Sequence, residues 1–287
     1  MLYFCGKLII KLRSIMETIL AATDFSSTAN KALDYASMLA KGQKTPVELK
    51  LLNVYHIKEE LKPILSEEYI KKLSRHELFD LMIAKQAQKL PAHIQLNGVL
   101  RKGPIVETIL QEAHESHSDC LIIGRNGHSG IKNWILGNTT LQLIEKSELP
   151  ILVIPQNAVV QPPKRIALAI DDRFVPSNKT LAPIYDLVDH FNTELVLFHV
   201  EQEAAHSNTH KETAIQIARK GYQINLFKMD SDNPTEALLE LSRKHEVDLL
   251  CLIKHDYTPW QQFLHKSTSS NLATRSNLPF MILKDQL

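Results

Sequence analysis

The chain contains the same sequence pattern twice, and this repeat constrains its fold more than any other feature. Four segments of the first half recur, in the same order, in the second half. The matched pairs, with the separation of equivalent residues along the chain, are ETILAATD and RIALAIDD (147 residues), LKLLNV and LVLFHV (146), GPIVETILQEAHESHSDCLII and NPTEALLELSRKHEVDLLCLI (130), and SELPILVI and SNLPFMIL (129). The first pair aligns Asp171 with Asp24. A repeat of this length is a whole fold rather than one unit of a solenoid, so it predicts a duplicated domain.

The repeat also predicts the domain boundaries. We expect an N-terminal extension at 1–14, a first domain at 15–156, a linker at 157–164 and a second domain at 165–287. Each domain then has an ordinary size for one globular unit, and a Pro-Pro pair stiffens the linker. The separation between matched segments falls once, because the segment after the second strand is shorter in the second half.

Apolar runs of strand length alternate with segments of helical spacing. In the first half we expect strands at 17–23, 48–55, 93–100, 119–123 and 149–154, and helices from 28 to Gly42, at 66–89, at 104–117 and from near Asn138 to 146. Ser26 or Ser27 can cap the first helix. This alternation predicts an α/β fold in which helices cover both faces of a mostly parallel sheet.

Composition excludes several classes of protein. Apolar residues make up 44% of the chain and charged residues 23%, as in an ordinary globular protein, and 33 basic residues nearly balance 32 acidic ones. The balance argues against nucleic acid as a partner. Cys120 and Cys251 lie in apolar runs, so we expect them to be small hydrophobic residues of the core rather than disulfide partners. Free cysteines are typical of a reducing compartment, so we expect a cytoplasmic protein.

The N-terminal extension, MLYFCGKLIIKLRS, gives no clear function. Its longest uncharged run is too short to span a membrane, and its basic residues interrupt any signal-peptide core. The first convincing strand begins near Ile15, so Met16 is a candidate start. We expect no membrane partner.

Four of the nine glycines, Gly124, Gly127, Gly130 and Gly137, follow directly after a predicted strand. Glycines allow backbone N–H groups to approach an anion, and the helix that follows adds its unpaired N–H groups and the positive end of its dipole. A phosphate cradle is one interpretation, and a tight strand-to-helix turn is the other. The P-loop and the dinucleotide-binding fingerprint are both missing.

The segment GRNGHSGIKNWILGNTT resembles the signature of the universal stress protein family: glycine, two residues, glycine, nine residues, glycine, then Ser or Thr. The opening TDFSSTANKAL, the Gly103-Pro104 turn and the closing LPILVIP are also similar to that family, and the likeness covers residues 15–285. The resemblance implies two tandem domains, each an open five-stranded parallel sheet of Rossmann-like, adenine nucleotide alpha-hydrolase-like fold.

The resemblance further implies ATP, or a related adenine nucleotide with Mg²⁺, in the first domain. Carried over by position, the residues that border the adenosine are Ala22, Thr23 and Asp24, with Val54 against the base, and those around the phosphates are Gly124, Arg125, Gly127, Gly137, Asn138, Thr139 and Thr140. Asn138 departs from the Ser or Thr of the family motif, which makes its backbone N–H the surer contact.

The second half departs further from the motif. Lys254 replaces the first loop glycine, and no glycine follows it. Side chains there would fill the space of a phosphate, so we expect no ATP binding of the same mode in this half. Asp24 itself is either a ligand contact or a helix cap, whereas Asp171 and Asp172 at the matching place are expected to be caps.

Catalytic and metal sites find little support. His114 and His117 share a predicted helix face, but a solvated helix end is the simpler interpretation, and no catalytic constellation stands out. We therefore expect a regulatory stress-response protein, with a slow ATP hydrolase or a scaffold without nucleotide as alternatives. The two halves are expected to form an internal pseudo-dimer through their last strands, around Ile151–Ile154 and Met281–Leu283, and the protein partner and any homodimer remain open.

Overall fold

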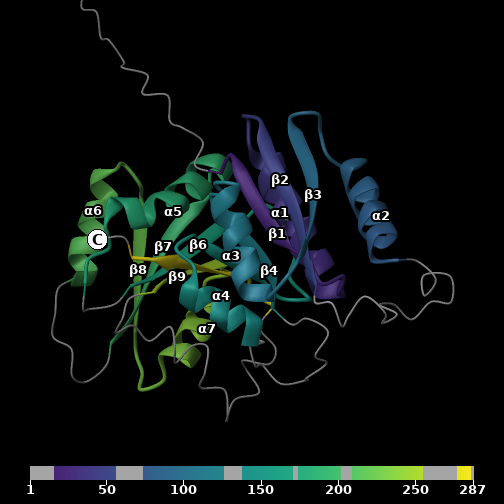
Figure 1. The fold of residues 1–287 in the computed structure, drawn as a ribbon. Helices are drawn as coiled ribbons and strands as arrows, with labels where there is room; N and C mark the ends of the chain where they lie inside the picture. Colours follow the sequence, from purple (N-terminus) through teal and green to yellow (C-terminus); the bar gives the residue numbers. More distant parts are fainter. Residues whose placement is uncertain are drawn as a thin grey trace, which may run out of the picture.

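The computed structural model describes residues 16–55, 74–125, 138–170, 174–201, 209–254 and 277–285. These residues form one ten-stranded sheet in the order β3-β2-β1-β4-β5-β10-β9-β6-β7-β8, with helices on both faces. Figure 1 shows β1 to β3 of the first half on one side of the molecule and β7 and β8 on the other.

Strands and helices alternate in both halves. The first half comprises β1 (Thr18–Ala22), α1 (Ser27–Gly42), β2 (Val47–Tyr55), α2 (Arg75–Ala87), β3 (Ile94–Lys102), α3 (Ile105–Glu115), β4 (Cys120–Gly124), α4 (Asn138–Lys146) and β5 (Ile151–Ile154). The second half comprises β6 (Arg165–Ile170), α5 (Asn178–Phe191), β7 (Glu194–Glu201), α6 (Thr209–Arg219), β8 (Ile224–Asp230), α7 (Pro234–Lys244), β9 (Leu249–Lys254) and β10 (Phe280–Lys284). The predicted α/β fold is confirmed.

All strand pairs within each half are parallel, and the two halves meet through one antiparallel pair, β5 with β10. The last strands are thus in contact, as the sequence predicted. Leu152 pairs with Met281, which is its own counterpart 129 residues later in the repeat. Equivalent residues therefore face each other across a pseudo-twofold axis, the arrangement of an isologous interface.

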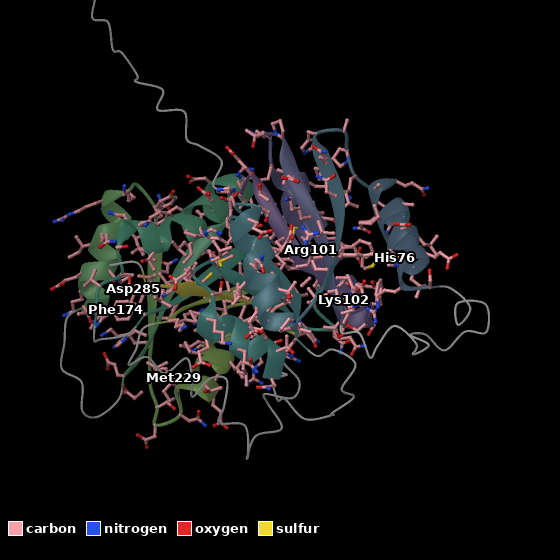
Figure 2. All side chains as sticks on the ribbon, in the orientation of Figure 1. His76, Arg101, Lys102, Phe174, Met229 and Asp285 are labelled. Carbon is pink, nitrogen blue, oxygen red and sulfur yellow. The ribbon has the colours of Figure 1, made fainter. Side chains whose placement is uncertain are left out.

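The core lies in two layers, one on each face of the sheet, and Figure 2 draws the described side chains on the ribbon. One cluster of buried apolar side chains packs α1, α2, α5 and α6 against the sheet, and the other packs α3, α4 and α7 against the opposite face. Both clusters run through both halves. Residues 19–21 of β1 are fully buried, as befits a central parallel strand covered on both faces. None of the helices in the described ranges is long and apolar enough to cross a membrane.

Cys120 and Cys251 both lie buried in this core as free cysteines. Burial raises the pKa of the Cys120 thiol to about 12, and burial likewise raises the pKa of the Cys251 thiol. Both side chains therefore stay protonated at neutral pH and act as small hydrophobic residues.

Strand pairing corrects the alignment of one matched segment. Cys120 pairs with Ile19 in the first half, and Leu249 pairs with Ile166 in the second, so β9 follows β4 by 129 residues rather than the expected 130. The alignment by sequence matched Pro104 with Pro234, but Pro104 is the N-cap of α3 whereas Pro234 is the first residue inside α7, so the alignment was shifted by one residue.

The end of α3 also differs from the expectation. The helix ends at Glu115, and His117 adopts the left-handed conformation with φ of 50°, so His114 and His117 do not share a helix face. The Ser118 N–H donates to the Ala113 carbonyl at 2.9 Å, which closes the helix with the long-range bond of a Schellman motif.

The same motif closes α7 in the second half. Glu246 has φ of 48°, and the Val247 N–H donates to the Ser242 carbonyl at 2.9 Å. A non-glycine residue in the left-handed region is uncommon, so its recurrence at matched positions is strong structural evidence of duplication.

Replacing His117 with glycine should raise the free energy of unfolding, by up to about 1 kcal/mol, because glycine adopts a positive φ without strain. Glu115→Gly, two residues earlier and inside the regular helix, should lower it by about 1 kcal/mol. Urea unfolding of both variants measures the difference. Equal destabilisation by the two glycines would contradict the left-handed conformation at 117.

Candidate functional site

The candidate site lies where the first half changes the direction of its strand connections. β1 and β4 are neighbours, and the chain continues from β1 to β2 on one side and from β4 to β5 on the other. In open parallel sheets such a switch point leaves a crevice beyond the carboxyl ends of the strands, where ligands bind. The structure thus brings the predicted residues that follow β1 and those that follow β4 to one sheet edge.

The turn from β1 into α1 is held by short-range hydrogen bonds. The Thr23 hydroxyl accepts the Phe25 N–H at 3.0 Å, and the Asp24 carboxylate accepts the Ser26 N–H at 3.0 Å. Ser26 is the helix cap, and its hydroxyl accepts the Ala29 N–H at 3.1 Å. Asp24 is therefore not the N-cap of α1, and its side chain is exposed beside the end of β1. Ala22, the last residue of β1, is half-buried.

Phe25, in the same turn, adopts the left-handed conformation with φ of 65°. Its buried ring packs edge-on against Phe79 of α2, with 6.3 Å between ring centroids. This contact in the core holds the turn in a conformation that phenylalanine rarely adopts.

Gly124 ends β4 against the first turn of α1. A Cβ atom at this position would lie 2.9 Å from the backbone carbonyl carbon of Thr28 and 2.8 Å from its Cγ2. The glycine is therefore required by close packing of strand and helix, which supports the tight-turn interpretation at this one position. Gly127 and Gly137 lie outside the described residues.

Arg125 follows directly, and its N–H donates to the Ile154 carbonyl at 2.9 Å, which ties the chain to the end of β5. Burial lowers the pKa of the guanidinium to about 10, so the group is still charged at neutral pH but poorly solvated. An anion nearby would offset the lost solvation of that charge.

The helix after the glycine segment begins at Asn138, as the sequence predicted. Asn138 and Thr139 are exposed in its first turn, whereas the side chain of Thr140 is buried. The first N–H groups of a helix have no partner within it, so this end of α4 favours negative charge.

The sequence did not predict the buried Asn53 next to the turn or its hydrogen bond with Arg75. The Asn53 amide donates to the Thr23 carbonyl at 2.6 Å, and its oxygen accepts a hydrogen bond from Arg75 at 3.0 Å. Arg75 also stacks over the rings of Phe25 and Tyr55. A fully buried asparagine within the apolar run LKLLNV was the available signal. Val54, the residue after Asn53, is buried near the same end of β2, against the opposite face of the sheet.

The strand register also corrects the expected counterpart of Gly124. Gly124 pairs with Ile154, and Ile253 pairs with Leu283 at the matching place, so Ile253 rather than Lys254 replaces the first loop glycine. Lys254 is the counterpart of Arg125, and its ammonium donates to the Ile144 carbonyl at 3.2 Å and to the Glu145 carbonyl. Both carbonyls belong to the last turn of α4, where a cation is favourable, so the counterpart of Arg125 caps a helix of the first half.

The turns into the first helix of each half also differ in length. Three residues separate β1 from the cap Ser26, whereas six separate β6 from the cap Ser177. The short connection brings Thr28 against Gly124, and the longer one accompanies Ile253 at the matching position. Asp171 and Asp172 lie outside the described residues. Within the described part of the chain, no cluster of His, Cys, Asp and Glu has the arrangement of a metal site.

Gly124→Ala should lower the free energy of unfolding by about 1–3 kcal/mol, because the added methyl group meets backbone atoms of Thr28. Gly103→Ala is the matched control: its methyl group meets only the Thr108 side chain, which can rotate away. Denaturant unfolding of the two variants provides the test, and a larger loss at position 103 would contradict the close approach at position 124.

Comparison with known proteins agrees with this geometry. Residues 16–155 match the model of the universal stress protein family. Universal stress protein YxiE of Bacillus subtilis is 28% identical over 149 residues, which cover 47% of this chain and 97% of that protein.

Two solved structures resemble almost the whole chain. A universal stress protein from Archaeoglobus fulgidus superposes with a TM-score of 0.70 at 19% identity, covering 94% of this chain and 97% of its own. A functionally unknown protein from Pseudomonas aeruginosa gives a TM-score of 0.61 at 16% identity, covering 95% of this chain and 94% of its own. These likenesses show the shared fold, and residues 16–155 are similar in sequence to the universal stress protein family.

Proposed function

We propose that the first half binds ATP or a related adenine nucleotide, and that the second half is a diverged copy that does not. The observation that carries this proposal is the convergence, at the switch point between β1 and β4, of Arg125, the turn from β1 into α1 and the first turn of α4. The family match of this half supports a role in stress response.

Electrostatics favour phosphate at this edge of the sheet. The Arg125 guanidinium has lost solvation, as its lowered pKa of about 10 indicates, and a phosphate oxygen would replace part of that solvation. The N–H groups of Asn138 and Thr139 at the start of α4 add donors and the positive end of the helix dipole. We assign the adenosine to the side of Ala22, Thr23, Asp24 and Val54, with Mg²⁺ accompanying the phosphates.

The proposed role is regulatory rather than catalytic. Helix α4 begins at the proposed phosphate site and ends where Lys254 of the second half donates to its carbonyls. A nucleotide that shifts or orders the start of α4 therefore acts on a helix whose other end is bound to the second half. Such a contact gives nucleotide occupancy a route to a surface that a protein partner recognises.

Isothermal titration of ATP with Mg²⁺ into the full chain should show one site per chain. Arg125→Gln should weaken binding about ten- to a hundredfold, because a charged hydrogen bond to phosphate is lost from a poorly solvated position. Arg219→Gln is the control, since it removes the same charge from an exposed position on α6 and should leave the affinity unchanged.

Absence of heat from the unmodified protein would reject nucleotide binding and leave the scaffold alternative. Two sites per chain would show that the second half has kept its function. Measurement of phosphate release over hours separates the remaining cases: steady release abolished by Arg125→Gln would identify a slow hydrolase, and the regulatory role predicts bound ATP that stays intact.

A further inference from the structure

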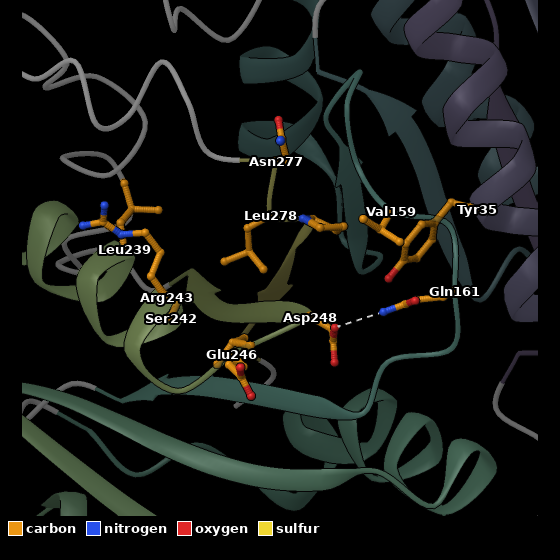
Figure 3. Close-up of a pocket in the computed structure, with 12 residues that line it drawn as sticks. Tyr35, Val159, Gln161, Leu239, Ser242, Arg243, Glu246, Asp248, Asn277 and Leu278 are labelled. Carbon is orange, nitrogen blue, oxygen red and sulfur yellow. Dashed lines mark hydrogen bonds between the residues drawn. The ribbon is translucent and has the colours of Figure 1, made fainter.

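A cavity of about 420 Å³ lies at the junction of the two halves, apart from the nucleotide-site residues. Figure 3 shows its walls, which come from α1 of the first half, the linker, the end of α7 and the segments that precede β9 and β10. Its volume is in the range of small-molecule sites, and such sites occur preferentially between domains. None of the residues assigned to the nucleotide lines it.

The most informative residue of the cavity is Tyr35 of α1. Its side chain is only 1% exposed, and its hydroxyl points into the cavity in Figure 3. No hydrogen bond joins this hydroxyl to any residue that the structure describes. The Tyr35 oxygen is not among the described polar atoms that are sealed from solvent, so water in the cavity accepts its proton, and a ligand oxygen at the same place would replace that water. Burial, with Cys251 and Asp248, raises the pKa of the hydroxyl, which keeps it a neutral donor.

The rest of the lining is mainly apolar. Leu239 and Val247 are buried in the wall, and Leu278 is half-buried beside them. Val159 of the linker is 64% exposed at the rim, which is unusual for a large apolar side chain in this protein. A ligand in the cavity would cover these side chains and gain the free energy of apolar burial.

Polar groups restrict the charge of the ligand. The Gln161 amide donates to Asp248 at 3.5 Å, a long bond that leaves the amide oxygen available as an acceptor. Asp248 itself accepts the backbone N–H groups of Lys164 and Arg165, at 2.7 and 3.0 Å, so its carboxylate is fixed in the wall. This carboxylate and that of Glu246 disfavour an anion, and in Figure 3 the guanidinium of Arg243 points away from the centre.

We propose that this cavity is a second ligand site, for a small, neutral, largely apolar molecule whose oxygen accepts a hydrogen bond from Tyr35. An aromatic ring that carries one hydroxyl or carbonyl group has this chemistry: the ring covers the apolar wall, and the oxygen pairs with the buried phenol. The ligand would contact α1 of the first half and α7 of the second, so its binding braces the junction. The site is independent of nucleotide binding, because the two share no residue.

Naphthol, which is neutral at pH 7, is a suitable probe, and naphthoate is its anionic match. Titration of the full chain with naphthol, in the presence of saturating ATP, should show one site that naphthoate occupies at least tenfold more weakly. Tyr35→Phe removes only the hydroxyl and should weaken naphthol binding about three- to tenfold. Naphthalene, which lacks the oxygen, should bind both proteins equally.

Two controls keep the result interpretable. Tyr222→Phe removes a hydroxyl that bonds to Asp189 outside the cavity, and it should leave naphthol affinity unchanged. Thermal unfolding without ligand should show Tyr35→Phe to be at least as stable as the unmodified chain, because the lost hydroxyl bonds to no residue that the structure describes. The proposal fails if naphthol does not bind, if Tyr35→Phe binds it equally well, if naphthoate binds as tightly, or if ATP displaces it.

Discussion

The antiparallel pair of β5 and β10 is the contact on which the rest of the molecule depends. β5 has four residues, all of them buried, and it joins two sets of parallel strands into one sheet. Without this pair, each half would expose an apolar sheet edge, which is an aggregation hazard. Because each face of the sheet carries one continuous cluster of side chains, the pair also joins both layers of the core.

Symmetry at this contact does not extend to the polar side chains near the carboxyl ends of the strands. In the first half Asn53 links the end of β1 to Arg75 of α2. Its counterpart, His199, instead stacks on His210 of α6, with ring centroids 4.4 Å apart. The matched strands have kept their register while the polar side chains at their ends have changed. The fold and the polar contacts at the strand ends therefore depend on separate positions.

The fold was predictable from the sequence because its signals are local or periodic. The alternation of apolar runs gave the strands and helices, and the repeat gave the duplication and the contact between the last strands. Two predictions were wrong. Proline occurs both at an N-cap and at the first helical position, so matching Pro104 with Pro234 shifted the alignment of one segment by one residue. The helical spacing of His114 and His117 placed the end of α3 too late, because His117 adopts the left-handed conformation.

The site was less predictable because its decisive contacts join residues far apart in the chain. The sequence named Ser26, Ser27 and Asp24 as possible caps of α1, and the choice of Ser26 depends on the backbone geometry of the turn. The close approach of Thr28 to Gly124 and the use of Lys254 at α4 follow from packing between elements. No pattern along the sequence indicates that Tyr35 faces a cavity whose other walls come from the second half.

The position of Lys254 has a consequence for how such a molecule can evolve. In an assembly of two identical subunits, a substitution appears at both symmetry-related places, so a lysine in place of Arg125 would alter both sites together. A chain that carries both copies is free of this constraint, since one copy can keep Arg125 while the other uses Lys254 to support its neighbour's helix. Because the two copies lie in one gene product, they can differ in sequence, and one half can specialise as a regulator of the other.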